Sequence, residues 1–235
     1  MNDLAAASHH SPAPHPERSS NESLYTTNAW LVFGATCFVY LFFNWYLQSQ
    51  VLTDQVYHYS LGNQVNPDKL TAYLEGQHRM VFVSYLVVPL TLLVKMVLVS
   101  FCLLAGLLLT EQKLSFRTLL RITLFAEASF IAGTLLRLLM LAFSHQIESL
   151  GQYMSFAPLS LYSLFPSSAV PNWLSYPLQT LDVFQAGYIF LLAVGLQHFA
   201  KKPFREMLRL VLCSYGLGLF CAMVAFAFIS ISFNP

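Results

Sequence analysis

Five long apolar runs divide the chain, and polar segments separate them. A helix that crosses the hydrocarbon core of a membrane needs about 20 mostly apolar residues, and each run is close to or above that length. The first run has Trp30 at one end and Trp45 and Tyr46 at the other, as is typical of helices that end at membrane interfaces. We therefore predict an all-α integral membrane protein, a bundle of about five transmembrane helices at residues 29–47, 81–109, 119–143, 181–199 and 208–233.

The polar segments predict the rest of the organisation. Residues 1–28 are rich in Ser, Pro, Ala and His and lack the apolar centre of a secretory signal, so we expect a disordered tail before a membrane domain at 29–235. Residues 48–79 and 144–180 read as excursions from the membrane. In the first, Asn66-Pro67-Asp68 predicts the start of a short helix through Leu74. In the second, the apolar piece at 156–165 is too short to span, which favours a re-entrant or interfacial segment before helix four.

The composition supports a membrane setting and excludes several classes. Hydrophobic residues make up 56% of the chain and charged residues 10%, against about 25% charged in soluble domains. The net charge of +1 argues against a nucleic-acid partner. The four cysteines all fall inside apolar runs, where they read as small buried residues. No protease, esterase, nucleotide-binding or haem-attachment motif occurs, so we predict a protein that is not an enzyme and has no cofactor.

Basic residues in the short loops predict the orientation. Seven of the twelve lie in or beside the turns between helices two and three and between helices four and five: Lys113, Arg117, Arg121, Lys201, Lys202, Arg205 and Arg209. The two excursions hold only Lys69 and Arg79. Because short cytoplasmic loops are enriched in Lys and Arg, we expect the N-terminal tail in the cytoplasm and the C-terminus outside it.

Four ionisable residues in the predicted helices are the candidate site. Lys95 falls near the middle of helix two, and Glu127 at a shallower depth in helix three, so the two can pair. A lone charge at the membrane centre costs about 2.5–3.5 kcal/mol on insertion scales. The preferred interpretation is a structural pair that holds two helices in register; the alternative is a proton or substrate site. Arg137, nearer the outer end of helix three, can similarly meet Asp182, although an acid at the start of helix four is also favoured by the helix dipole.

Two pairs on the outer side have the spacing of metal ligands: Glu75 with His78, and His145 with Glu148. Residues three apart share a helix face, and Glu-x-x-His supplies two ligands in di-metal bundles. Such sites need further carboxylates from partner helices, and none is evident. Ordinary interfacial polar residues are therefore the preferred interpretation, and no metal is expected.

Small residues recur at positions 213–218 in helix five and at 132–134 in helix three. Small side chains let helix backbones approach each other closely in lipid. We expect these patches to be places of close helix packing.

Three short stretches near helix four resemble a known family: Pro158–Phe165 (PLSLYSLF), Pro177–Phe184 (PLQTLDVF) and Leu191–Leu196 (LLAVGL). They are similar to Yip1-domain membrane proteins, in which a short apolar segment precedes Asp-x-Phe and a helix that ends in a Leu-x-x-Gly-Leu-like run. The resemblance covers about residues 80–235 and implies a five-helix bundle with a cytoplasmic N-terminus and no defined catalytic residues. Residues 1–79 lack the acidic region typical of eukaryotic members, so the resemblance implies a bacterial member in the inner membrane.

Three functions remain open at this point. The first is a non-catalytic membrane protein that scaffolds or stabilises a larger membrane or envelope assembly, with the lipid bilayer and other envelope proteins as its partners. The alternative is a transporter or channel component that uses the Lys95–Glu127 pair and a kink at Pro89. The third, an outward-facing metal or acid/base enzyme, rests only on Glu75, His78, His145 and Glu148.

Overall fold

The computed structural model describes residues 28–51, 56, 67–143, 150–166 and 169–233. Every regular element in these residues is a helix. Within them, five helical stretches are long and apolar enough to cross a membrane: Ala29–Gln50, Tyr85–Leu109, Phe116–Phe143, Val183–Ala200 and Phe204–Ser232. The predictions of an all-α, multi-pass membrane protein and of five spanning helices are therefore confirmed. The predicted tail lies outside the described residues, except for its last residue.

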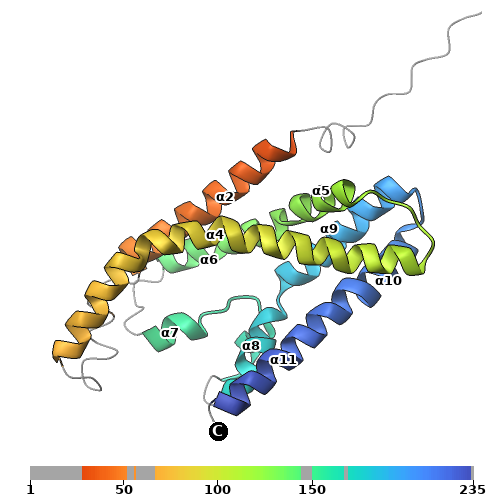
Figure 1. Cartoon of the computed structure of the whole chain (residues 1–235). Helices are drawn as coiled ribbons and strands as arrows, with labels where there is room; N and C mark the ends of the chain where they lie inside the picture. The colour runs from red at the N-terminus through yellow and green to blue at the C-terminus, as the bar shows by residue number, and fades with distance from the viewer. Residues whose placement is uncertain (1–27, 52–55, 57–66, 144–149, 167–168, 234–235) are drawn as a thin grey trace, which may run out of the picture.

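The first spanning helix consists of α2 (Ala29–Tyr46) and a short π-helical continuation, η1 (Leu47–Val51). Asn28 begins it, because its side-chain oxygen accepts a hydrogen bond from the backbone N–H of Trp30 at 3.3 Å. The helix contacts α4, α5 and α6, which are described below, and lies along one side of the bundle (Figure 1).

The second helix, α4 (Pro67–Leu109), is 43 residues long. The predicted start at Asn66-Pro67-Asp68 is thus correct, but the prediction of a separate short helix is wrong, because the helix continues without interruption into the membrane span. Figure 1 shows α4 as one long, curved helix. Pro89 lies inside it and, having no backbone N–H, removes one hydrogen bond of the helix, which is a common cause of such bending.

The third span is divided at Glu127 into α5 (Phe116–Ala126) and α6 (Ala128–Phe143). The backbone hydrogen bonds continue across the division: the N–H of Glu127 donates to the carbonyl of Thr123 at 3.2 Å, and the N–H of Ile131 donates to that of Glu127 at 2.9 Å. The interruption is therefore a mild bend. It was not predicted, since no Gly or Pro marks it.

The segment before helix four folds against the bundle in short pieces: α7 (Leu150–Ser155), a 3-10 turn η2 (Leu161–Leu164) and α8 (Asn172–Thr180). α9 (Val183–Ala200) follows after a break at Leu181 and Asp182. Two backbone hydrogen bonds fix this break, from Leu161 N–H to the carbonyl of Leu181 at 2.9 Å and from Val183 N–H to that of Leu159 at 3.2 Å. The predicted apolar piece at 156–165 accordingly forms a turn rather than a spanning helix.

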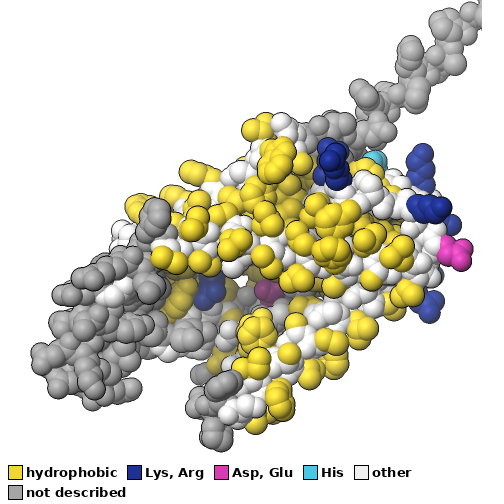
Figure 2. Space-filling view, in the orientation of Figure 1, with side chains coloured by type: hydrophobic (Ala, Val, Ile, Leu, Met, Phe, Trp, Pro, Cys, Tyr) yellow, Lys and Arg dark blue, Asp and Glu magenta, His cyan; other side chains and the backbone are white. Residues whose placement is uncertain are grey.

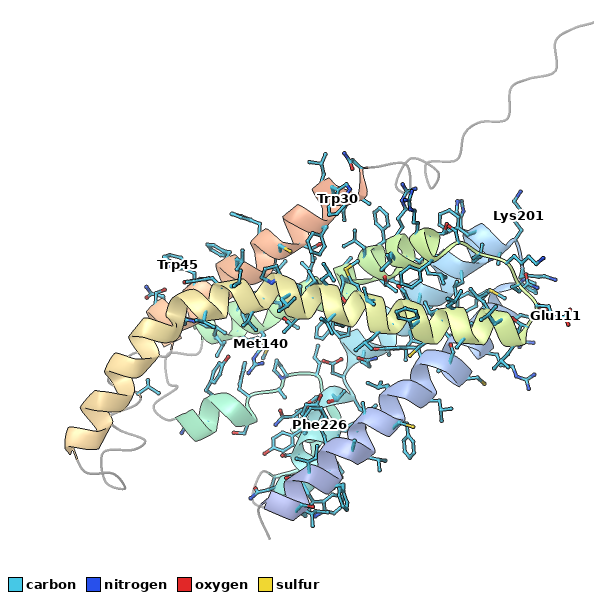
Figure 3. The ribbon with its side chains drawn as sticks, viewed as in Figure 1. Trp30, Trp45, Glu111, Met140, Lys201 and Phe226 are labelled. Atoms are coloured by element: carbon cyan, nitrogen blue, oxygen red, sulfur yellow. The ribbon has the colours of Figure 1, made fainter. Side chains whose placement is uncertain are left out.

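The last span joins α10 (Phe204–Val211), a π-helical turn η4 (Leu212–Gly216) and α11 (Leu217–Phe233). It begins four residues earlier than predicted, because extended Pro203 precedes the first helical residue. α8 packs along α11, and the rings of Tyr176 and Phe226 have centroids 4.4 Å apart. Figure 3 shows Phe226 in the region where these two helices meet.

The core lies between α4, α5, α9 and α10, where fully buried side chains meet: Leu103, Leu107, Leu119, Tyr188, Leu192, Leu196 and Val211. Glycines permit the closest approaches. A Cβ atom at Gly195 would lie 2.6 Å from Ile122 Cγ2, and one at Gly133 would lie 2.7 Å from Phe184 Cγ. The small-residue patch in helix three thus marks close packing, as predicted.

Basic side chains gather at one end of the bundle, where α4 turns into α5 and α9 turns into α10 (Figure 2). These exposed residues are Lys113, Arg117, Lys201, Lys202 and Arg205. Glu111 and Lys201 lie at the same end in Figure 3. We call this the basic end of the bundle.

Candidate functional site

Lys95 and Glu127 form an ion pair inside the bundle. Lys95 Nζ lies 2.9 Å from Glu127 Oε1 and donates a hydrogen bond to Oε2 at 3.2 Å. The side chain of Glu127 is completely buried. The contact expected between helices two and three is therefore present, and it places the carboxylate at the division between α5 and α6.

Aromatic residues from three other positions complete the surroundings of the pair. Lys95 Nζ lies 3.7 Å from the centroid of the Phe130 ring and 5.2 Å from that of Tyr188, where the ring faces stabilise a cation. The hydroxyl of Tyr40 donates to Glu127 Oε2 at 3.2 Å. Side chains from α2, α4, α6 and α9 thus converge on this ion pair, which supports the structural interpretation.

Arg137 and Asp182 do not meet, so the expectation that they pair is wrong. In the described part of the chain, no ion pair links them. Arg137 Nη2 instead donates to the backbone carbonyl of Tyr153 at 3.3 Å, and the guanidinium lies 5.0 Å from the centroid of the Tyr153 ring. Asp182 is the N-cap of α9, and its Oδ1 accepts from the backbone N–H of Gln185 at 2.5 Å. The helix terminus, rather than the arginine, holds this carboxylate.

A cavity of about 330 Å³ brings three of the four predicted residues together. Lys95, Arg137 and Asp182 supply its charges, and its other polar lining residues are Tyr40, Thr134, Ser160 and Gln179. The Nε of Arg137 is buried and has no hydrogen-bond partner among the residues that the structure describes. We call this cavity the charged pocket. Figure 2 shows charged side chains of both signs inside the hollow that opens below α4 in that view.

The pocket lies deep in the bundle, on the side away from the basic end. α5 has 11 residues, so Glu127 lies about 16 Å from the start of that helix at 1.5 Å per residue. α9 has 18 residues, so Asp182 lies about 27 Å from its basic end. The hydrocarbon core of a membrane is about 30 Å thick. The ion pair is therefore near mid-membrane, and Asp182 is near the far boundary.

A second cavity, of about 500 Å³, lies between α2 and α4. Its polar lining residues are Tyr40, Asn44, Thr91, Lys95 and Glu127. Lys95 and Tyr40 line both this cavity and the charged pocket. The ion pair therefore stands where the two cavities adjoin.

The predicted metal-ligand pairs lie where the structure describes no side chains. Glu75 and His78 lie in the first part of α4, and His145 and Glu148 fall outside the described residues. Among the described residues, no three His, Cys, Asp or Glu side chains come together in a way that could hold a metal ion.

Sequence reasoning missed the neutral residues that support the charged ones. Tyr40 and Phe130 look like ordinary residues of apolar helices, and only the folded chain places them against the ion pair. Gln185 could have been predicted to take part, since a side-chain amide within a spanning helix needs a hydrogen-bond partner. Its Nε2 donates to the hydroxyl of Tyr215 at 2.9 Å, which links α9 to the last span.

The chain matches no protein-family model, no curated protein and no solved structure. The fold and the charged pocket therefore carry the functional argument, and the resemblance to Yip1-domain proteins stays a prediction.

Proposed function

We propose that this membrane protein binds a small polar solute in the charged pocket and acts as a transporter or channel component. One observation carries the proposal: Arg137 and Asp182 face the same cavity with opposite charges, yet neither has an oppositely charged partner among the described residues. Both side chains are partly buried, and a charge that is removed from water without an opposite charge is costly. A solute with one negative and one positive group, such as an amino acid, would stabilise both side chains at once.

The break between α8 and α9 supports this proposal. The N-terminus of α9 begins at the wall of the pocket, next to Asp182. In many transporters, helices that are interrupted within the membrane supply the binding site, because the freed backbone groups and the helix dipole interact with the solute. The two backbone hydrogen bonds at Leu181 and Val183 hold this break in place.

The position of Lys95 also supports it. Lys95 lines the charged pocket and the second cavity, so a solute or proton that moves between the cavities passes the ion pair. Neutralising Lys95 would change the charge that lines both cavities.

The proposal includes an orientation. Since cytoplasmic loops are enriched in Lys and Arg, we place the basic end and the N-terminus in the cytoplasm and the C-terminus outside. The charged pocket then lies in the outer half of the membrane. The resemblance to Yip1-domain proteins supports a bacterial inner membrane as the location that we propose.

A second candidate, a non-catalytic scaffold of an envelope assembly, is favoured by apolar side chains beyond the spanning helices. Leu164, Phe165 and Trp173 are exposed near the end of the bundle opposite the basic end. Gentle extraction in a mild detergent tests it. A constant set of envelope proteins that remains bound would support the scaffold, and purification of the isolated protein from an extract in which other complexes survive would count against it.

Solute retention tests the transporter proposal. Purified protein in vesicles is incubated with amino acids, with simple carboxylic acids and with simple amines, and the retained solutes are measured by mass spectrometry. We expect retention of a solute with both charges, and loss of it in Arg137→Gln and Asp182→Asn but not in Lys113→Gln, an exposed residue at the basic end. If folded protein retains none of these solutes, the proposal is wrong.

A further inference from the structure

A groove at the basic end lies between α2, α4 and α5 and has a volume of about 560 Å³. Most of its lining is apolar and includes Phe33, Leu93 and Leu124. Two arginines, Arg117 and Arg121, also line it, and no acidic residue does. We call it the basic groove. It is separate from the charged pocket, with which it shares no lining residue.

The two arginines lie on one face of α5, because residues four apart are neighbours on a helix surface. Leu120 and Leu124 line the same groove, and Leu124 is buried there against α2 and α4. Leu119 and Ile122 of this helix are buried instead in the core that includes α9 and α10. The helix thus turns one face toward the bundle and a different face, with both guanidinium groups, toward the groove.

The groove combines a charged entrance with an apolar interior. Arg117 is in the first turn of α5, and Leu124 lies about 10 Å further along the helix axis, which is toward the membrane centre. Both arginines are exposed, and in the described part of the chain neither forms an ion pair with a carboxylate. Two positive charges at the level of the lipid headgroups are therefore left without an anion from the part of the chain that the structure describes.

We propose that the basic groove binds an anionic phospholipid, with its phosphate on Arg117 and Arg121 and an acyl chain along the apolar lining. Guanidinium groups suit phosphate because they donate paired hydrogen bonds in a fixed geometry. Basic pockets between membrane helices on the cytoplasmic side bind anionic headgroups. The apolar interior favours a lipid over a free phosphate ion, because an acyl chain can fill it. The two arginines have no acidic residue beside them in the groove, so a lipid with net negative charge is favoured over a zwitterionic one.

The chain offers a matched control for the arginine pair. Arg205 and Arg209 have the same spacing on α10, and both are exposed. They line none of the three cavities described above. A general attraction between basic residues and anionic lipid would involve both pairs, whereas a built site involves only Arg117 and Arg121.

Lipid binding to delipidated full-length protein tests this proposal, with phosphatidylglycerol and phosphatidylcholine as probes and native mass spectrometry as the readout. We expect phosphatidylglycerol to bind in preference to phosphatidylcholine. The double variant Arg117→Gln/Arg121→Gln should bind phosphatidylglycerol about tenfold or more weakly, because each basic residue near the membrane surface raises the affinity for an anionic lipid about fivefold. Arg205→Gln/Arg209→Gln should bind like the unaltered protein. Equal losses in both double variants, or no loss in the first, would overturn the site.

A third variant tests the apolar part of the groove and remains informative if the first double variant fails to fold. Leu120→Trp keeps both charges but fills the groove. We expect it to lose phosphatidylglycerol binding to a similar extent. Full retention of the lipid by a folded Leu120→Trp protein would show that no acyl chain occupies the groove. Neither outcome depends on the solute proposed for the charged pocket.

Discussion

Lys95 Nζ lies 2.9 Å from Glu127 Oε1. This ion pair connects α4 directly to Glu127, the residue at which the third spanning helix divides into α5 and α6. The ion pair is also the point at which the charged pocket and the second cavity adjoin. A structural contact and the proposed solute path therefore share the same two residues. Stability and binding have to be measured separately to assign the pair a role.

Replacing one member of the pair should destabilise the protein. Lys95→Met leaves the Glu127 carboxylate buried without its cation, and Glu127→Gln leaves the ammonium without its anion. Removal of one partner of a buried pair typically costs about 3–5 kcal/mol, whereas replacing both is far less harmful. We expect both single variants to unfold at lower temperature in detergent and the double variant to recover part of the loss. Unchanged unfolding temperatures combined with lost solute flux would instead assign the pair to the transport path.

Tyr40→Phe should weaken the same cluster by a smaller amount. The substitution removes the hydroxyl that donates to Glu127 Oε2 at 3.2 Å and leaves the ring in place. The expected cost is about 1.5–3 kcal/mol, since the bond is made to a charged group. Tyr46→Phe on the same helix is the control, and thermal unfolding is the measurement. Equal effects of the two variants would show that the hydroxyl of Tyr40 contributes nothing specific.

Asp182 allows its capping role and its charge to be separated. Asn at this position still accepts a hydrogen bond from the backbone N–H of Gln185 but carries no charge, whereas Ala does neither. We expect Asp182→Ala to lower stability by about 0.5–2 kcal/mol and Asp182→Asn to preserve it. Both variants should lose binding of a solute with two opposite charges. Normal binding by Asp182→Asn would show that this carboxylate serves only the helix.

Gly195→Ala should disturb the packing of α9 against α5. The added methyl group would lie 2.6 Å from Ile122 Cγ2, so one of the helices or the isoleucine must shift, at a typical cost of about 1–3 kcal/mol. Gly34→Ala is the matched control, because nothing lies within 4 Å of a Cβ atom at that position. The unfolding temperature should fall in the first variant and stay the same or rise in the second. A fall of the same size in both would point to a general effect of replacing helical glycine.

The sequence was sufficient to predict the features that follow from the length of the apolar runs and from the free-energy cost of an unpaired charge in lipid. Five runs predicted the five spans, and an unpaired charge is so unfavourable in lipid that Lys95 and Glu127 could be paired from their depths alone. It was not sufficient where local and tertiary effects compete. Asp182 could satisfy either Arg137 or the helix that follows it, and only the folded backbone shows that the helix holds it. The uninterrupted course of α4 from Pro67 was likewise hidden, because its first part lacks a long apolar run.

The break at Leu181 and Asp182 divides the pocket wall between two sets of helices. Gln179 belongs to α8, which packs on α11, whereas Asp182 starts α9, which packs on α5, α6 and α10. Two residues of non-helical chain connect these sets. Because α11 continues from α10 through the π-helical turn η4, a small rotation of α8 and α11 about that turn would change the width of the pocket. The ion pair and the core between α4, α5, α9 and α10 would stay intact.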